Sequence, residues 1–587
     1  MAHVRDAVLS KPTHFNFAED VIDHWANKLP KLEALYWLSG DMTVSQTFTY
    51  SHIATQSHRI ASLFQSLGVQ PGEKVVLICP RLPQWWEVAV ACLRLSVVLC
   101  PATTLLVDKE IQYRCQKTNA TVFVGNTDSI AKFRRVQGQC PSVKHVLQLG
   151  NGGTFPTLEV IQLKNALKEI PLDRKVKSSQ SKSDDPALIY FTSGTSGPPK
   201  MVQHTHASYP LAHALTGKHW LQLSPGNVYW NLAEQGWGKA AWSMFGAWNC
   251  GATLFVFDDR STFSATKMTH ILSNFPIQTL CAPPTVYRHL VLQQHNPEFV
   301  SSQPFNKLTH CVSAGEALNN EVIRQWHKMT NIVIREGYGQ TETTLLCGNF
   351  EGTPTRPGSM GKPVPGVPLS VVDSFGNECV AGVEGDIALI LSDGDKASPF
   401  FGFFDGYLGD DGECVAPIRT SERRSWYSTG DRAFKDTGGY FWFVGRADDV
   451  INASGYRIGP FEVESVLAAH QGIVESAVVC SPDPIRGEVV KAFIVLTTEW
   501  AERASKDADG VVKDVQAFCK KNAAPYKYPR KVQFVTGSFL PKTISGKIRR
   551  RELRDMEWGL GPKINGKPQK MRSPEVIPKM QRSTVVA

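Results

Sequence analysis

The chain of 587 residues is 42% hydrophobic and 20% charged, which is typical of a globular protein with two or more domains. No run approaches the ~18 apolar residues of a membrane-spanning helix, and the first residues lack the apolar core of a secretory signal. The net charge is +9, yet from Val515 onward 17 Lys and Arg face only 4 Asp and Glu, which predicts a polyanionic ligand or a solvated basic face.

Apolar runs and amphipathic stretches alternate between residues 50 and 450. Runs rich in β-branched residues predict strands at 74–80, 97–103, 121–126, 252–258, 278–284 and 307–316. The segments 83–95 and 321–329 predict helices between them. This alternation favours an α/β fold with parallel sheets and helical crossovers.

Two further patterns of predicted secondary structure follow in the C-terminal part of the sequence. Short strands and many glycines over 358–446 predict a small β-rich subdomain. A helix, two strands, a helix and a strand are then expected at 461–470, 474–482, 491–497, 512–521 and 530–536. We expect a large N-terminal domain of α/β layers over 1–447, a small α+β domain over 448–560, and a basic, loose tail over 561–587.

The stretch "YFTSGTSGPPK" (190–200) follows an apolar strand and combines glycines, hydroxyls and one lysine. It does not match the G-x-x-x-x-G-K-[ST] phosphate loop, because two prolines separate Gly197 from Lys200 and Met201 follows. Its glycines still allow backbone N–H groups to converge on an anion. A polyphosphate site is one interpretation, and a flexible surface turn is the other.

Four further strings follow in chain order: "REGYGQTET" (335–343), "YSTGDRA" (427–433), "GRADDVINASGYRIGPFEVE" (445–464) and "LPKTISGKIRRRELRD" (540–555). In the first, Glu342 beside a hydroxyl suits Mg²⁺ on a phosphate, and Tyr338 suits stacking on a purine. In the second, Asp431 suits the two hydroxyls of a ribose. Taken alone, the string at 335–343 is equally typical of an ordinary turn from a strand into a helix.

Together the five strings resemble the adenylate-forming superfamily of acyl-CoA synthetases, luciferases and peptide-synthetase adenylation domains. Within it the chain is similar to medium-chain acyl-CoA synthetases, and the resemblance runs from "FNFAEDVIDHW" through "HCVSAGEALNNEVIRQW" to "LPKTISGKIRR". It implies an enzyme in which a carboxylic acid and ATP form an acyl-adenylate and pyrophosphate. The thiol of coenzyme A then displaces AMP.

The resemblance also implies the site. Lys547 is the catalytic residue, placed between the α-phosphate and the carboxylate, and Glu342 holds Mg²⁺. The implied ATP-binding residues are Thr192, Ser193, Gly194, Thr195, Ser196, Gly197, Pro198, Pro199, Lys200, Gly315, Glu316, Ala317, Glu336, Gly337, Tyr338, Gly339, Gln340, Thr341, Asp431, Arg446 and Lys547. For Lys547 taken alone, a solvated lysine on a basic turn is the alternative.

In this family the small C-terminal domain is mobile and rotates between the two half-reactions, and Asp448 matches its hinge. The coenzyme A residues implied are Ser454, Gly455, Tyr456, Arg457, Arg486, Tyr528 and Arg530. Gly455 would keep a channel open for the pantetheine arm, although a plain turn glycine is the alternative.

The acid is expected to bind at the aromatic segment 230–248, with Trp237 and Gly315 as substrate-binding residues. Medium-chain fatty acids and small aromatic acids are both expected, although aromatics at such spacing also form plain core. For His204 and His206 we expect a hydrogen bond at a helix start and not a metal.

Two rival functions remain open: transfer of the acyl group to a carrier protein or to oxygen, and a non-catalytic nucleotide-binding protein. The coenzyme-facing strings count against the first, and an intact Lys547, Glu342 and Asp431 count against the second. No nucleic-acid partner and no membrane span are expected, and the chain is expected to be a monomer or homodimer. The start of the chain is acidic and poor in arginine, which favours the cytoplasm over the mitochondrial matrix.

Overall fold

A computed structural model describes residues 10–560 except 151, 154, 156–157, 193–198, 296–304, 306, 317, 454–455, 484–486, 524–526 and 544–546, together with 563–564 and 567–568. The chain divides into two compact units. Unit 1 comprises Met1–Gly382, Ile387–Thr429 and Lys435–Trp442, and unit 2 comprises Val383–Asp386, Gly430–Phe434 and Phe443–Ala587. The main break therefore lies beside the position predicted for the hinge.

The first sheet of unit 1 has the strand order β21-β20-β9-β8-β4-β3-β5-β6-β7. Its middle strands are parallel and almost wholly buried, because helices cover such sheets on both faces. The bounds are β3 (Lys74–Ile78), β4 (Val98–Ala102), β5 (Val122–Gly125), β6 (His145–Gln148), β7 (Ile161–Gln162), β8 (Pro186–Thr192), β9 (Lys200–Thr205), β20 (Gly406–Leu408) and β21 (Cys414–Val415). The strands predicted at 74–80, 97–103 and 121–126 are confirmed.

The second sheet of unit 1 has the order β16-β15-β14-β13-β12-β10-β11-β1-β2. Strands from β14 to β1 are parallel, and antiparallel strands close both edges. The bounds are β1 (Glu33–Ser39), β2 (Ser45–Thr49), β10 (Val228–Asn231), β11 (Thr253–Asp258), β12 (Thr279–Cys281), β13 (His310–Ala314), β14 (Ile334–Gly339), β15 (Leu345–Gly348) and β16 (Lys362–Pro363). The strands predicted at 252–258, 278–284 and 307–316 are confirmed.

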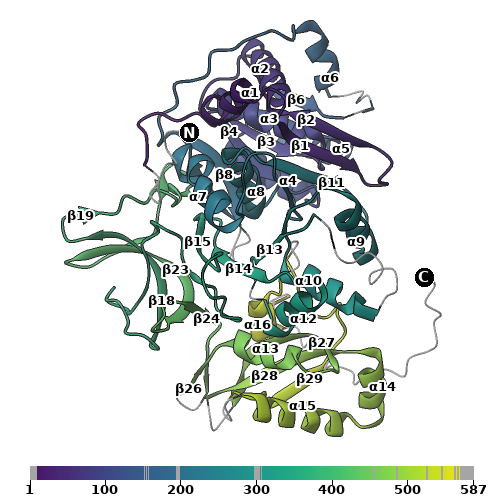
Figure 1. The fold of residues 1–587 in the computed structure, drawn as a ribbon, viewed down its shortest axis with the longest axis vertical. Coiled ribbons are helices and arrows are strands. Elements are labelled where there is room, and N and C mark those ends of the chain that lie inside the picture. The colour runs from purple at the N-terminus through teal and green to yellow at the C-terminus, as the bar shows by residue number, and fades with distance from the viewer. Residues whose placement is uncertain are drawn as a thin grey trace. The chain divides into compact units, whose positions relative to one another are not determined.

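Helices connect and cover these strands (Figure 1). The longer ones are α2 (Tyr50–Ser66), α3 (Pro83–Arg94), α4 (Asp108–Thr118), α5 (Thr127–Arg134), α8 (Gly238–Asn249), α9 (Ala265–Asn274), α10 (Pro284–Val291) and α12 (Asn320–Thr330). Local chemistry sets their ends: Thr49 caps α2, a proline opens α3, and Asn331 ends α12 in the left-handed conformation. Among the described helices, none is both long and apolar enough to cross a membrane.

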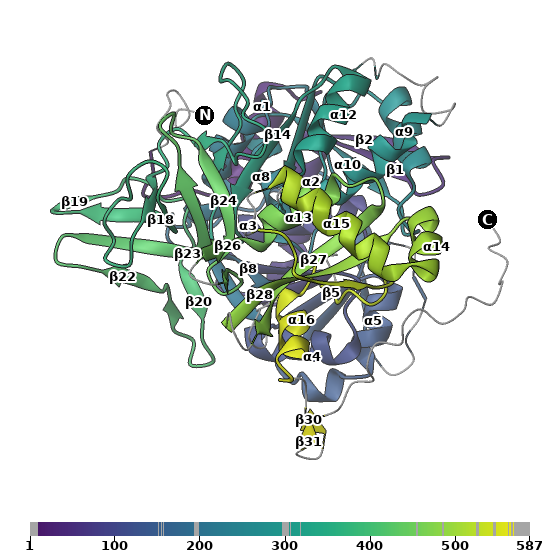
Figure 2. The same cartoon turned by 90° about the horizontal axis from the view of Figure 1, so that it is seen from below.

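The predicted β-rich subdomain is confirmed as a six-stranded sheet of order β17-β18-β23-β22, with β19 beside β18 and β24 beside β23. Its strands are β17 (Leu369–Val372), β18 (Glu384–Asp393), β19 (Lys396–Ala397), β22 (Ile418–Thr420), β23 (Arg424–Lys435) and β24 (Phe441–Arg446). Figure 2 shows β18, β22 and β23 as neighbouring arrows of this layer. Strands β23 and β24 carry Asp431 and Arg446.

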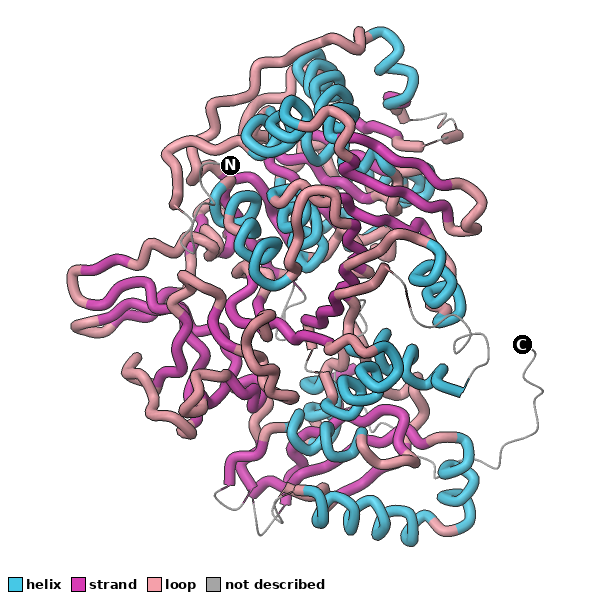
Figure 3. The backbone as a smooth tube through the Cα atoms, in the orientation of Figure 1, coloured by secondary structure: helices cyan, strands magenta, loops and turns pink. Residues whose placement is uncertain are grey.

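Unit 2 continues as an α+β domain with the strand order β26-β25-β28-β27 and β29 beside β28. Its elements are β25 (Ile451–Ala453), β26 (Tyr456–Ile458), α13 (Pro460–Ala468), β27 (Ile473–Asp483), β28 (Gly487–Leu496), α14 (Thr498–Lys506), α15 (Ala508–Asn522), β29 (Lys531–Phe534) and α16 (Arg550–Glu557). Figure 3 shows helices flanking these strands. The predicted order of helices and strands is confirmed, whereas most of the predicted tail lies outside the described residues.

Candidate active site

The Gly/Ser/Thr loop joins two paired strands. Strands β8 and β9 are antiparallel, and Thr192 is opposite Lys200, so both ends of the loop lie at one end of the hairpin. The residues between them that matter most to the sequence prediction, Ser193, Gly194, Thr195, Ser196, Gly197 and Pro198, lie outside the described residues. Pro199 is held by its carbonyl, which accepts a hydrogen bond from Tyr113 Oη at 3.1 Å.

Glu342 and Thr341 follow β14 and are held by separate contacts. Tyr407 Oη donates to Glu342 Oε1 at 2.7 Å, and the carbonyl of Glu342 accepts the N–H of Phe404 at 2.9 Å. Lys200 Nζ lies 4.5 Å from the centroid of the same Tyr407 ring. The predicted phosphate lysine and metal-binding carboxylate therefore both contact one tyrosine.

His204 holds the backbone of Thr341. Its Nε2 donates to the Thr341 carbonyl at 2.6 Å, while Nδ1 is 3.1 Å from Ser208 Oγ. Burial lowers the pKa of His204 to about 3, so the ring is neutral and adds no charge. The backbone N–H of Thr205 donates to Ser208 Oγ at 2.9 Å, and the backbone N–H of Ser208 donates to Thr205 Oγ1 at 3.1 Å. Such hydrogen bonds are typical of a helix start.

The predicted adenine-binding turns lie side by side. Strands β13 and β14 are parallel, with Ala314 opposite Gly337, so Gly315 and Glu316 emerge at the same edge as Tyr338. Gly315 has φ +101°, a conformation that favours glycine. Ala317 lies outside the described residues.

Glu336 stabilises the turn after β13 from inside the protein. Its Oε1 accepts the N–H of Leu318 at 2.8 Å, and burial raises the pKa of its carboxyl to about 8. The glycines of "EGYG" are required by packing: a Cβ on Gly337 would lie 2.5 Å from the Trp220 ring, and one on Gly339 2.5 Å from the Thr344 carbonyl oxygen. The chain then enters the antiparallel strand β15, so the interpretation of 335–343 as a turn into a helix is wrong.

Helix α8 runs from the nucleotide residues to a cavity. A Cβ on Gly238, its first residue, would lie 3.2 Å from Thr341 Oγ1, and Lys239 Nζ donates to the Ala314 carbonyl at 2.7 Å. Gln340 is fixed nearby, since its Nε2 donates to the Thr429 carbonyl at 2.9 Å. Trp237 occupies the N-cap position of α8 without a side-chain capping hydrogen bond, and it is partly exposed.

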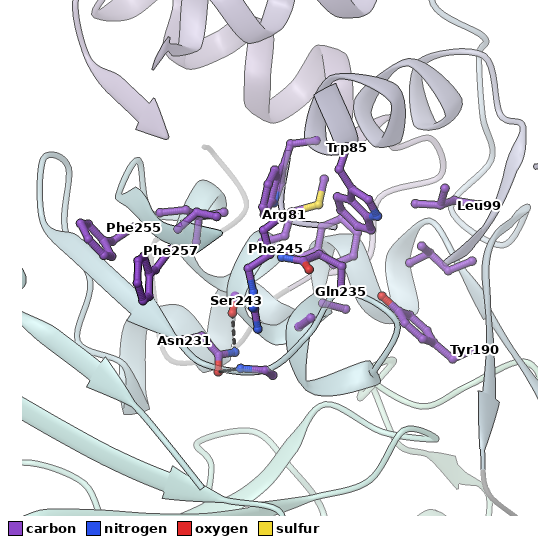
Figure 4. A pocket seen from close by; sticks show the side chains of 18 residues that line it. Arg81, Trp85, Leu99, Tyr190, Asn231, Gln235, Ser243, Phe245, Phe255 and Phe257 are labelled. Atoms are coloured by element: carbon purple, nitrogen blue, oxygen red, sulfur yellow. Dashed lines mark hydrogen bonds between the residues drawn. The ribbon is translucent and has the colours of Figure 1, made fainter. Parts of the chain in front are cut away.

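The cavity has a volume of about 30 Å³, room for a water-sized group. It is lined mainly by apolar side chains from α3, α8 and strands of both sheets, including Trp85, Tyr190, Met244 and Phe245 (Figure 4). Trp237 is not among its lining residues. Gln235 is buried against it, and its Oε1 has no hydrogen-bond partner among the described residues.

In unit 2, Asp431 and Arg446 come together on neighbouring strands. Arg446 Nη1 lies 3.4 Å from Asp431 Oδ1, and its Nε lies 3.5 Å from Asp448 Oδ1. Asp431 is buried, whereas Asp448 is exposed just after β24 and its carbonyl accepts a hydrogen bond from Arg554. Asp431, predicted to bind the ribose, and Asp448, predicted to be the hinge, therefore both contact Arg446.

Lys547 is exposed in unit 2, and its backbone is hydrogen-bonded to Thr543. Thr543 N–H donates to the Lys547 carbonyl at 2.7 Å, and Lys547 N–H donates to Thr543 Oγ1 at 3.1 Å. Residues 544–546, between these two, lie outside the described residues. The backbone of Lys547 is therefore fixed while its side chain reaches solvent.

The coenzyme A candidates are only partly described. Ser454, Gly455 and Arg486 lie outside the described residues, and Tyr456 and Arg457 belong to β26. Tyr528 is flanked by two cations, with Lys520 Nζ 4.3 Å and the Arg530 guanidinium carbon 5.0 Å from its ring centroid. Arg530 also donates to Tyr528 Oη at 2.9 Å. These side chains form a cationic, aromatic surface.

Two family models match the chain. The model of the AMP-binding enzymes matches residues 22–390, and that of the AMP-binding enzyme C-terminal domain matches residues 462–547. The chain belongs to the AMP-binding enzyme family. The match to the C-terminal model ends at Lys547.

Relatives of this AMP-binding enzyme cover nearly its whole length. It is 42% identical to the mitochondrial acyl-coenzyme A synthetase ACSM5 of Homo sapiens, over 93% of this chain and 91% of that protein. It is also 42% identical to the mitochondrial acyl-coenzyme A synthetase ACSM3 of Mus musculus, over 94% and 92%. The solved anthranilate CoA ligase AuaEII, in complex with anthranoyl-AMP, is 27% identical with a TM-score of 0.78 and covers 93% of this chain and 98% of its own. The predicted membership among acyl-CoA synthetases is confirmed.

Sequence reasoning missed two residues of this AMP-binding enzyme, Tyr407 and Lys239, and one contact, the hydrogen bond of His204 to Thr341. Tyr407 lies in "SPFFGFFDGYLG", and the many aromatic residues and glycines of this string could have indicated a functional segment. His204 was considered only as a metal ligand or helix start. Lys239 is the one cation inside the aromatic segment 230–248, a signal that was present in the sequence.

Proposed function

We propose that this AMP-binding enzyme is an AMP-forming acid–CoA ligase. A carboxylate oxygen of the acid attacks the α-phosphorus of ATP and pyrophosphate leaves. The thiol sulfur of coenzyme A then attacks the acyl carbonyl, the thiol proton is lost, and AMP leaves. The proposal is carried by relatives named acyl-coenzyme A synthetases that match 93% and 94% of the chain.

The first half-reaction brings two anions together, so its barrier is largely electrostatic. We assign Lys200 and the 192–200 loop to the β- and γ-phosphates, Thr341 to the α-phosphate, and Asp431 to the ribose. The turn at Gly315 and Glu316, with Tyr338, is assigned to adenine. These assignments are supported by the hairpin that fixes Lys200 and by the hydrogen bond that fixes Thr341.

Glu342 is the proposed Mg²⁺ residue. No group of three His, Cys, Asp or Glu side chains among the described residues is arranged to hold a metal ion, so Glu342 would act as a single carboxylate. One protein oxygen suits Mg²⁺, which prefers oxygen ligands and is often bound largely by phosphates and water. The ion would neutralise phosphate charge.

The second half-reaction needs Lys547 to give way to a thiol. We propose that the small domain, 448–560, rotates about Asp448 relative to 1–447, and that Gly455 then lines the pantetheine channel. The exposed turn at Asp448 supports a hinge there. The cationic surface at Tyr528 and Arg530 suits the phosphates of coenzyme A. No role is assigned to the basic tail 561–587.

We propose a medium-chain fatty acid or a small aromatic acid as substrate, with its tail directed along α8 toward the apolar cavity. Gln235 would face a polar substituent on that tail. The curated relatives are called mitochondrial, which favours the mitochondrial matrix over the cytoplasm that the start of the chain suggested. A monomer or homodimer stays a prediction.

A pyrophosphate-release assay with a panel of acids, with and without coenzyme A, tests the function. An AMP-forming CoA ligase needs acid for pyrophosphate release and coenzyme A for sustained turnover and thioester formation. Release of pyrophosphate without any thioester would favour transfer to a carrier protein or to oxygen. Nucleotide binding with no pyrophosphate release for any acid would contradict the proposal.

A further inference from the structure

One short segment, residues 402–408, connects Lys200, which is assigned to the phosphates, with Glu342, which is assigned to Mg²⁺. At one end, the carbonyl of Gly402 accepts the N–H of Thr344 at 3.0 Å, and Phe404 N–H donates to the Glu342 carbonyl at 2.9 Å. At the other end, β20 pairs with β9, with Tyr407 opposite Val202. The segment is thus fixed both to the strand that begins at Lys200 and to the backbone of Glu342.

The side chain of Tyr407 makes the same connection. Its Oη donates to Glu342 Oε1 at 2.7 Å, and Lys200 Nζ lies 4.5 Å from its ring centroid. A hydrogen bond to a charged group is a stronger contact than a cation over an exposed ring, so the hydroxyl should matter more than the ring. A lysine side chain is long and has many rotamers, so even the weaker contact restricts where its ammonium is found.

We infer that Tyr407 is a positioning residue that orients Glu342 for the divalent cation and Lys200 for the phosphates before nucleotide binds. The inference rests on the proposed function. The hydroxyl acts on Glu342 and the ring acts on Lys200, so the two effects are separable by mutation. Without the hydroxyl the Glu342 carboxylate has more orientations to lose when the cation binds. Without the ring, the Lys200 side chain has more orientations to lose when the phosphates bind.

A purely structural role is the competing explanation, since Tyr407 also packs against Phe404 with ring centroids 5.0 Å apart. Tyr407→Phe keeps that packing and the ring facing Lys200, and it removes only the hydroxyl. Tyr407→Leu removes the ring as well. Tyr440→Phe is a matched control, because Tyr440 Oη donates to the Pro354 carbonyl at 2.6 Å and two cations, Arg356 and Lys362, lie over its ring.

The full-length enzyme and the three variants are compared by calorimetric ATP binding in excess Mg²⁺ and in chelator, by the Mg²⁺ concentration giving half-maximal pyrophosphate release, and by thermal melting. In Tyr407→Phe we expect the half-maximal Mg²⁺ concentration to rise about 10-fold, while ATP affinity in chelator and the melting temperature stay near wild type. In Tyr407→Leu we expect ATP affinity in chelator to fall as well, by about 2–5-fold. Tyr440→Phe should match wild type in every readout.

An unchanged Mg²⁺ requirement in Tyr407→Phe, or equal losses of ATP affinity in chelator for the Phe and Leu variants, would overturn the inference and leave the proposed function intact. A lowered melting temperature that accounts for the whole loss in both variants would also overturn it. If the wild-type chain neither binds ATP nor releases pyrophosphate with any acid, the proposed function fails, and the inference fails with it.

Discussion

The imidazole of His204 hydrogen-bonds the carbonyl oxygen of Thr341, with 2.6 Å between Nε2 and oxygen. The acceptor is a carbonyl, so Nε2 carries the proton and Nδ1 faces Ser208. The ring of Tyr209 stacks on the imidazole, with centroids 3.7 Å apart and an interplanar angle of 20°. A neutral, fully buried histidine therefore fixes the backbone of a residue assigned to the α-phosphate.

Replacing His204 by phenylalanine should impair adenylation. The stack on Tyr209 is kept, but the Thr341 carbonyl loses its donor, which costs about 1–3 kcal/mol. We expect kcat/KM for ATP, measured by pyrophosphate release, to fall about 10-fold or more. His206→Phe is the matched control, because both ring nitrogens of His206 are buried without a hydrogen-bond partner in the described part of the chain. Equal losses in the two variants would contradict the positioning role of His204.

Lys547→Ala and Gly455→Leu should separate the half-reactions. Loss of the Lys547 ammonium should slow acyl-adenylate formation by about 10²–10³-fold while sparing thioester formation from synthetic acyl-adenylate. Gly455→Leu should do the reverse. Lys542→Ala is the control for the loss of a nearby lysine. Lys542 forms an ion pair with Glu475 at 2.9 Å, and no part of the reaction is assigned to it. If both variants lost the same half-reaction, the proposed rotation of the small domain between the half-reactions would be wrong.

Glu336→Gln should change how stability depends on pH. Burial raises the pKa of the Glu336 carboxyl to about 8 from its ordinary value of 4.5, so between these pH values the folded state holds a proton that the unfolded state releases. Wild-type stability from this group is therefore present below pH 4.5 and lost as pH rises toward 8. An amide cannot ionise and still accepts the Leu318 N–H. We expect the melting temperature of the variant minus that of wild type to rise by about 1–3 °C between pH 5 and 8; a constant difference would contradict the assignment.

Met244→Ala should shift acid preference toward longer or bulkier acids. Met244 is buried and lines the cavity beside α8, so its truncation enlarges the space for the substrate tail. Filling a hydrophobic pocket with one more methylene is worth about 1–3 kcal/mol, so the kcat/KM ratio of a longer to a shorter acid should rise about 10-fold. Met268→Ala is the control, because Met268 is equally buried and is not among the residues that line the cavity. An unchanged ratio would place the acid elsewhere.

The parallel strands and their helices could be predicted because their local signals are strong. Fully apolar runs such as Val98–Ala102 lie in the sheet interior, and helix α3 starts at a proline and buries nearly every residue. The N-terminal strands β1 and β2 were not predicted. Their half-buried patterns do not reveal that β1 pairs with β11, more than two hundred residues later.

The charged residues of the site could be predicted from motifs, whereas the contacts between motifs could not. Glu342 and Lys200 each lie in a recognisable string, but Tyr407 joins them from a third segment. Likewise Gly337 and Gly339 suggested a turn, although they continue a strand because Trp220 and Trp242 pack against their Cα atoms. Packing of this kind depends on residues far along the chain, which no local pattern encodes.

Strands β1 and β2 precede every strand of the first sheet in the sequence, yet they complete the edge of the second. The strands of the two sheets therefore alternate along the sequence and are not grouped sheet by sheet. A split version of this protein, expressed as two polypeptides cut near residue 225, would separate β1 from β11 and β9 from β20, which leaves an open sheet edge on each fragment. Fragment complementation would have to rebuild that five-residue parallel pairing, from Leu35–Leu254 to Ser39–Asp258, before either half resembled the intact molecule.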